Sequence, residues 1–291
     1  METSRFPTTV RLRTMSTFSK GRALGGALLL VAALCLTAWT PGPVSAPAER
    51  APTAVAPTPT PEYAENGMVV SAKRTASEAG VEMLRKGGNA VDAAVATGFA
   101  LAVVHPWAGN IGGGGFMVIR MPDGSVTTID HREDAPSGAT QEVFLDADSN
   151  AVRSRSRRGY LASGVPGTVA GLLKALEEHG TLDRETVMAP AIRLAREGFP
   201  LPHSLAQDLN GSYEDFAAFP PTKKYFTKGD STQTYRPGER FVQEDLAETL
   251  VRIREQGRAG FYRGETAELI AEQFEANGGL ITEQDLAEYR A

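Results

Sequence analysis

The segment GGGGFMVIRMPDGSVTTIDHREDAP (residues 112–136) indicates the fold most directly. Two β-rich runs, Phe116–Met121 and Ser125–Asp130, are joined through Asp123-Gly124, a dipeptide typical of tight hairpin turns. The glycines stand before a strand, whereas glycine loops that bind phosphate stand before a helix, and neither a G-x-G-x-x-G nor a P-loop pattern fits. The segment therefore predicts a β-hairpin entered through a tight passage, where residues without side chains let two backbones approach closely.

A charged turn, Asp130-His-Arg-Glu-Asp-Ala-Pro136, follows the hairpin and places Arg132 directly after the second strand. A guanidinium binds a carboxylate through two parallel hydrogen bonds, and a strand end holds such a group still. Arg132 is therefore either the centre of an ion-pair cluster with its acidic neighbours or a clamp for a carboxylate ligand. From the residues alone, the ion-pair role is favoured.

Helical segments make up most of the remaining folded part. Asn89 suits the N-cap of a helix running to about Val104, and this helix is apolar nearly all round, which predicts a buried position. Residues 67–72 predict a short apolar strand, and residues 210–240 predict a long loop rich in aromatic side chains. The other expected helices are Ser77–Lys86, Thr168–His179, Arg184–Glu197, Asp245–Gln256, Glu265–Asn277 and Thr282–Arg290.

Composition excludes several classes of function. The chain has 291 residues, 42% of them hydrophobic, and a formal net charge of -5, so it has no electrostatic reason to bind nucleic acid or anionic lipid. Cys35 is the single cysteine and lies in a segment expected to be removed, which excludes disulfides and thiolate catalysis in the mature protein. The four histidines share no metal-binding spacing, and the calcium-like start at Asp146 lacks the required glycine. We therefore expect neither a metal nor a cofactor.

Residues 1–48 have the parts of a secretory signal peptide, and an uncleaved anchor is the alternative. A basic stretch precedes an almost unbroken apolar run over residues 23–40, and Ala46-Pro-Ala48 has the small-x-small form of a cleavage site. Val44-Ser-Ala46 is a rival site, and Met15 is a rival start. Residues 49–65 are rich in Pro, Ala and Thr and predict a flexible linker. The folded part is expected over residues 66–291, in a periplasmic or secreted protein, with no membrane contact beyond the signal segment.

Several stretches, in the same order and spacing, resemble γ-glutamyltransferases (glutathione hydrolases). The resemblance extends from about residue 67 to residue 290. The motifs that carry it are Lys86–Val95, Ala108–Met117, Asp130–Pro136, Ala162–Gly171, Pro190–Phe199, Phe261–Gly264 and Gly278–Leu286.

The resemblance implies an α/β fold, the αββα sandwich of N-terminal-nucleophile hydrolases, here incomplete because only the large-subunit part is present. In that family a precursor cuts itself into two subunits and frees a threonine, whose own amine serves as base while its hydroxyl attacks the γ-amide of glutathione or glutamine. The nucleophile would lie beyond Ala291, since Thr8-Thr9 and Thr127-Thr128 lack the family's cleavage context. No catalytic residue is therefore assigned in this chain.

The same resemblance assigns one substrate-binding residue, Arg132, as the ligand of the α-carboxylate of the γ-glutamyl group. It also implies a small subunit as partner, supplied by the same precursor or by a second chain, and predicts that the isolated chain is poorly soluble and inactive. Two other functions stay open: a cephalosporin (glutaryl) acylase of the same superfamily, and a non-catalytic remnant that serves as a binding module.

Overall fold

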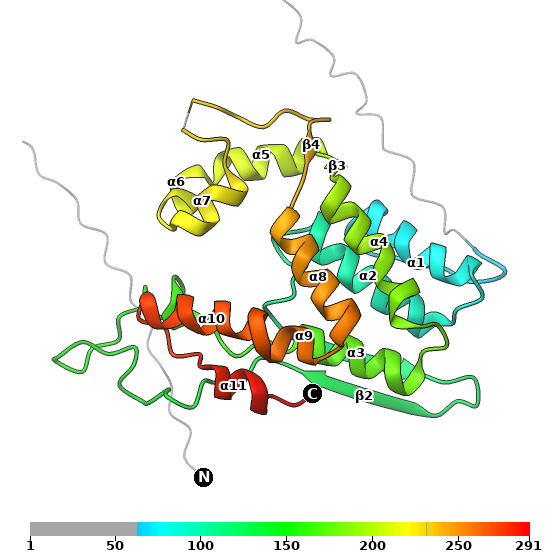
Figure 1. Cartoon of the computed structure of the whole chain (residues 1–291), viewed down its shortest axis with the longest axis horizontal. Coiled ribbons are helices and arrows are strands. Elements are labelled where there is room, and N and C mark those ends of the chain that lie inside the picture. The colour runs from blue at the N-terminus through cyan, green and yellow to red at the C-terminus, as the bar shows by residue number, and fades with distance from the viewer. Residues whose placement is uncertain (1–62, 231) are drawn as a thin grey trace, which may run out of the picture. The chain divides into compact units, whose positions relative to one another are not determined.

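The predicted hairpin is present in the structure, a computed structural model that describes residues 63–230 and 232–291 (Figure 1). Strands β1 (Gly115–Arg120) and β2 (Val126–His131) pair antiparallel, with Met117 opposite Ile129. Gly124 closes the turn at a φ of 88°, and its N–H donates to the Met121 carbonyl at 2.9 Å. Glycine adopts this positive φ without steric strain, which explains why the turn contains Asp123-Gly124.

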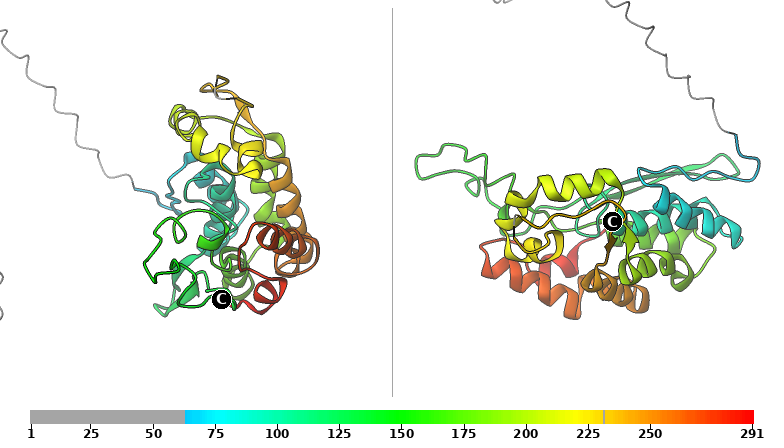
Figure 2. Two further views of the ribbon diagram at one scale, coloured as in Figure 1. Left: turned by 90° about the vertical axis from the view of Figure 1, so that its left-hand side faces the viewer. Right: turned by 90° about the horizontal axis from the view of Figure 1, so that it is seen from above.

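Helices cover one face of the hairpin and leave the other open (Figures 1 and 2). Helix α3 packs on both strands, while Phe116, Val118 and Val126 on the opposite face are 68%, 71% and 61% exposed. The described residues contain the helices α1 (Arg74–Arg85), α2 (Ala90–Val104), α3 (Thr168–His179), α4 (Arg184–Glu197), α5 (His203–Gly211), α6 (Tyr213–Ala217), α7 (Pro220–Phe226), α8 (Glu244–Gln256), α9 (Ala259–Tyr262), α10 (Gly264–Ala276) and α11 (Glu283–Glu288), and one 3-10 turn (Tyr160–Ala162).

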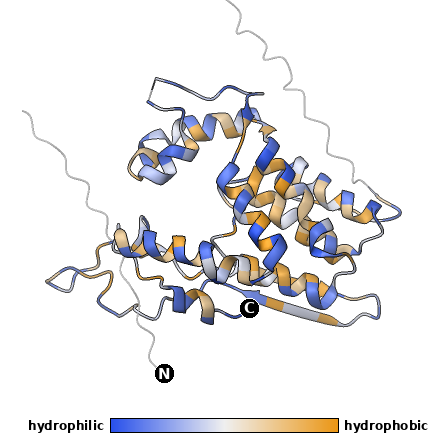
Figure 3. Cartoon of the chain, viewed as in Figure 1, coloured by the Kyte–Doolittle hydropathy of each residue, from blue (hydrophilic) through white to orange (hydrophobic). Residues whose placement is uncertain are grey.

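Helix α2 is the central element of the core, as its apolar sequence predicts. It packs against α1, α3 and α4, and Val95, Phe99 and Val103 are fully buried. Figure 3 shows apolar residues running along α2 and along α4 and α8. Asn89 caps the helix with its side chain and accepts from the N–H groups of Val91 and Asp92. The cap and the burial pattern of this helix were both predictable from the sequence.

Asp92, the only charged residue of α2, is fully buried and ties the helix to the turn between α3 and α4. Its carboxylate accepts from the N–H groups of Asn89, Thr181 and Leu182 and from the Thr181 hydroxyl, at 2.7 to 3.1 Å. Burial alone would raise the pKa of Asp92, but these hydrogen bonds outweigh it and lower the pKa below its usual value.

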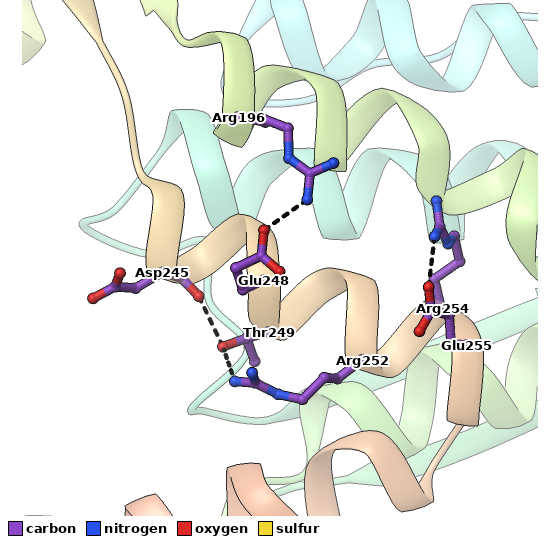
Figure 4. Close-up of polar contacts among 7 residues, drawn as sticks. All are labelled: Arg196, Asp245, Glu248, Thr249, Arg252, Arg254 and Glu255. Atoms are coloured by element: carbon purple, nitrogen blue, oxygen red, sulfur yellow. Dashed lines mark hydrogen bonds and ion pairs between the residues drawn. The ribbon is translucent and has the colours of Figure 1, made fainter.

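Helix α8 packs on α4 beneath a layer of polar contacts (Figure 4). Arg196 of α4 donates to Glu248 of α8 at 2.7 Å, and Arg254 pairs with Glu255 at 2.9 Å. Because the Arg196 and Glu248 side chains are both more than half exposed, their pair contributes little to stability, and the buried Leu250 and Ile253 hold the helices together.

Two predictions about secondary structure were wrong. Residues 210–240 are not one long loop, because they include the end of α5 and the short helices α6 and α7. Residues 67–72 form no strand, since the described part of the chain places no strand beside them. A short pairing of β3 (Phe199–Pro200) with β4 (Arg240–Phe241) was not predicted.

The structure does not describe residues 1–62. The predicted signal peptide (residues 1–48) and all but the last three residues of the predicted linker (residues 49–65) therefore lie outside the described residues. Within the ranges that are described, no helix combines the length and the apolar character needed to cross a bilayer.

Candidate functional site

Arg132 follows β2 immediately, and its side chain points into solvent. The Arg132 N–H donates to the Asp130 carboxylate at 3.0 Å, which fixes the backbone where the strand ends. The Arg132 side chain is 63% exposed, and its Nε lies 3.5 Å from Glu133 Oε2. An exposed ion pair of this length contributes little free energy, so a ligand carboxylate can replace it at small cost.

The glycine-rich passage brings the residues before Arg132 against the start of α3. A Cβ on Gly114 would overlap the His131 carbonyl oxygen and would lie 2.8 Å from Glu133 N, and a Cβ on Gly167 would overlap the same carbonyl. Gly171, one turn into α3, faces the His131 ring and leaves no room for a side chain. Of the glycines 112–115, Gly114 shows the predicted close approach to another backbone, whereas a Cβ on Gly112 would meet open space. The approach at Gly114 seats the segment that carries Arg132.

Asn110 joins this passage to the N-terminus of α3. Its Oδ1 accepts from Gly113 N at 2.8 Å and from the Thr168 hydroxyl at 2.7 Å. The Gly113 carbonyl in turn accepts from the N–H groups of Gly167 and Thr168, at 2.7 and 2.9 Å. The first N–H groups of α3 are thus satisfied by the loop itself.

Helix α11 and the residue that follows it, Tyr289, also contact the Arg132 segment. The Tyr289 hydroxyl donates to the Arg132 carbonyl at 2.8 Å, and the Asp285 carboxylate accepts from Ser137 N at 2.8 Å. Sequence reasoning missed both contacts, because 157 and 148 residues separate the partners. Thr282 and Asp285 also form a capping box at the start of α11.

His131, Thr127 and Thr128 take structural positions, while Thr8 and Thr9 lie outside the described residues. His131 is buried beneath α3, and burial lowers the pKa of its imidazole. Thr127 and Thr128 lie within β2, away from any chain terminus. In the part of the chain that the structure describes, no group of three or more His, Cys, Asp and Glu side chains is arranged to hold a metal ion.

Comparison with solved structures identifies the fold class of this chain. The chain superposes on the γ-glutamyltranspeptidase of Helicobacter pylori with a TM-score of 0.77 at 47% identity, covering 79% of this chain and 66% of that one. It superposes on the cephalosporin acylase of Bacillus halodurans with a TM-score of 0.70 at 31% identity, covering 81% of this chain and 45% of that one. The fold is therefore the mixed α/β, helix-rich large-subunit region of an N-terminal-nucleophile hydrolase, as predicted.

Comparison of the sequence with known families assigns the chain to one family of these hydrolases. A family model described as gamma-glutamyltranspeptidase matches residues 76–291, and the chain belongs to that family. The glutathione hydrolase proenzyme of Pseudomonas sp. (strain A14) is 50% identical over 232 residues, which are 79% of this chain and 40% of that protein. The chain thus spans less than half the length of this relative, and the family membership predicted from the ordered motifs is confirmed.

Proposed function

We propose that this chain is part of the large subunit of a γ-glutamyltransferase that hydrolyses or transfers the γ-glutamyl group of glutathione and related γ-glutamyl amides. The observation that carries the proposal is Arg132: an exposed guanidinium at the end of β2, held on a fixed backbone, within a segment that the family model matches. A charge-assisted contact between this group and the donor α-carboxylate contributes about 1.5–3 kcal/mol.

In this proposal the remaining chemistry belongs to a partner segment that this chain does not contain. A small subunit, from the same precursor or from a second chain, supplies a threonine whose α-amine is the base and whose hydroxyl attacks the γ-amide carbon of the donor. The attack gives a γ-glutamyl-enzyme and releases the amine, and water or an acceptor amine then resolves the ester. Arg132 holds the donor by its α-carboxylate throughout, so that the amide carbon is presented to the nucleophile.

The open face of the hairpin supports a partner of this kind. Phe116, Val118 and Val126 form an apolar strip on strands whose other face is covered by α3. A sheet face of this kind is usually covered in the assembled protein, and left open it promotes aggregation. The relative from Pseudomonas sp. is named a proenzyme, which fits a partner cut from the same precursor.

We place the assembled protein in the periplasm or outside the cell. The support is the basic stretch, apolar run and small-x-small site within residues 1–48. Fractionation of cells that express the complete reading frame tests this, because a protein retained in the cytoplasm at full length would contradict it.

A glutaryl acylase is the second candidate function, and the likeness to the cephalosporin acylase of Bacillus halodurans favours it. A glutaryl group presents a carboxylate to Arg132 but lacks the α-amino group of a γ-glutamyl donor. The two candidates therefore differ in how strongly turnover depends on that amino group. A non-catalytic binding module, the third possibility, would turn over neither amide.

The experiment is to express the complete reading frame and, separately, the 291-residue chain. We expect the complete product to cut itself into two subunits and to release p-nitroaniline from γ-glutamyl-p-nitroanilide at least about tenfold faster than from the glutaryl analogue, since the α-amino group would make its own charge-assisted contact. The 291-residue chain should be inactive. Robust turnover by the 291-residue chain, or a preference for the glutaryl amide, would contradict the proposal.

A further inference from the structure

Tyr289, directly after α11, is buried and is held by contacts of both its ring and its backbone. Its ring is 4% exposed and stacks on Tyr262 with centroids 5.7 Å apart and planes 7° apart. The guanidinium of Arg258 lies 4.3 Å above the Tyr262 ring and donates to the Tyr289 carbonyl. Ring, backbone and neighbouring cation therefore fix where the Tyr289 hydroxyl points.

The Tyr289 hydroxyl points at the segment that carries Arg132. It donates to the Arg132 carbonyl at 2.8 Å, and it fits there because Gly167 has no Cβ, which would otherwise overlap the hydroxyl. Burial, followed by the nearby carboxylates of Asp134, Asp130 and Glu133, raises the pKa of Tyr289 to about 12. Because this pKa lies far above 7, the hydroxyl is protonated and can donate a hydrogen bond at neutral pH.

Both backbone groups of Arg132 are thus hydrogen-bonded. The Asp130 carboxylate holds its N–H at 3.0 Å and Tyr289 holds its carbonyl at 2.8 Å, so the two peptide planes on either side of its Cα are fixed. The direction of the Cα–Cβ bond follows from these two planes. The Arg132 side chain, which is exposed and only weakly paired, therefore starts from the backbone in one fixed direction. Fixing this direction lowers the conformational entropy that is lost when the guanidinium binds a carboxylate.

A second contact from α11 reinforces the first. Asp285 accepts from Ser137 N at 2.8 Å and also from the N–H and hydroxyl of Thr282, at 2.9 and 2.7 Å. Asp285 of α11 and Tyr289 just after it thus hold the backbone at Ser137 and at Arg132, respectively.

We propose that Tyr289 is a positioning residue for substrate binding: its hydroxyl, by holding the Arg132 carbonyl, orients the Arg132 guanidinium toward the α-carboxylate of the γ-glutamyl donor. The inference rests on the proposed function of Arg132. Tyr289 itself touches no substrate, so its effect passes through Arg132 alone.

The test is Tyr289→Phe in the complete, self-cleaved enzyme, because phenylalanine keeps the stack on Tyr262 and removes only the hydroxyl. We expect KM for γ-glutamyl-p-nitroanilide to rise about three- to tenfold, the usual effect of losing one neutral hydrogen bond, with kcat changed less than about twofold. For the analogue whose α-carboxylate is a carboxamide, wild type and variant should have the same KM. An unchanged KM, or an equal penalty on both donors, overturns the proposal.

Tyr262→Phe is the matched control, since it removes the hydroxyl of the stacked partner, which donates to the Pro166 carbonyl at 2.7 Å. This hydroxyl has no contact with Arg132, so the variant should lose thermal stability without distinguishing the two donors. A selective KM increase in Tyr262→Phe equal to that in Tyr289→Phe would assign the effect to the stack and overturn the positioning role.

The Arg132→Ala variant separates failure of the inference from failure of the proposed function. If Arg132→Ala leaves KM unchanged, the proposed function fails whatever Tyr289 does. If Arg132→Ala raises KM and Tyr289→Phe does not, only the inference fails. In the Arg132→Ala background Tyr289→Phe should add no further loss, and independent, additive losses would overturn the coupling.

Discussion

Replacing Asp92 with alanine should destabilise the fold far more than an ordinary surface change. The carboxylate accepts four hydrogen bonds from Asn89, Thr181 and Leu182 in a site with no exposed surface. Thr181 is exposed, so water can satisfy its donors after the substitution, and we count the other two bonds at about 1.5 kcal/mol each. The expected loss is therefore about 3 kcal/mol, or roughly 6 to 12 °C in Tm for a domain of this size.

The same residue gives a test that depends on pH. The pKa of folded Asp92 is lowered, so its stabilisation is fully present above the unfolded pKa and is lost as pH falls through the folded pKa. Asp92→Asn cannot ionise, so the difference in unfolding free energy between wild type and this variant should shrink below about pH 4. Urea unfolding followed by circular dichroism measures both quantities.

Asp183→Ala is the control, because Asp183 is an exposed N-cap whose side chain accepts only from Thr186 N, at 2.7 Å. The free energy of unfolding of Asp183→Ala should be about 1 kcal/mol lower than that of wild type. If Asp92→Ala loses no more than Asp183→Ala, or if the gap between wild type and Asp92→Asn does not change with pH, the description of Asp92 as a buried, charged anchor is wrong.

Two further predictions concern the hairpin. Gly171→Ala should lower the free energy of unfolding in urea by about 1–2 kcal/mol, because the new Cβ would approach His131 Cδ2 to 2.5 Å, although alanine itself favours a helix. Gly98→Ala is the control and should be near neutral, since its Cβ would meet movable methyl groups of Leu172 at 3.0 Å. Phe116→Lys with Val118→Lys should raise the soluble fraction of the 291-residue chain and lower the yield of assembled enzyme. Gln207→Lys with Gln256→Lys, which adds the same charge at exposed positions of α5 and α8, is the control, and equal solubility of the two variants would argue against an apolar contact surface.

Sequence patterns predicted the elements whose signals are local. The hairpin follows from Asp123-Gly124 between two β-rich runs, and α3 and α4 have the predicted bounds. Helix α2 was recognised by its Asn89 cap and its unbroken apolar surface. In α2 one short stretch contains both the start signal, Asn89, and the buried face.

Elements that depend on distant partners were missed. Helices α6 and α7 are too short to be stable alone, and their aromatic residues pack on remote positions: Phe216 stacks on Trp107 at 5.8 Å and Phe226 lies 6.2 Å from Phe241. The contact of Tyr289 with Arg132 likewise has no counterpart in any local pattern. The residue types around Arg132 suggested an ion-pair cluster, and only the structure shows a single long pair, with Glu133.

The most direct test of the central claim is the kinetic effect of Arg132→Ala in the complete, self-cleaved enzyme. Loss of a charge-assisted contact of about 1.5–3 kcal/mol should lower kcat/KM for a γ-glutamyl donor roughly 10- to 150-fold, mainly by raising KM. The kcat/KM of Arg132→Lys should lie between those of wild type and Arg132→Ala, since lysine keeps the positive charge but cannot form the two parallel hydrogen bonds of a guanidinium. The α-carboxamide donor should be insensitive to both changes. An unchanged KM for the γ-glutamyl donor in Arg132→Ala would contradict the claim and remove Arg132 from the substrate site.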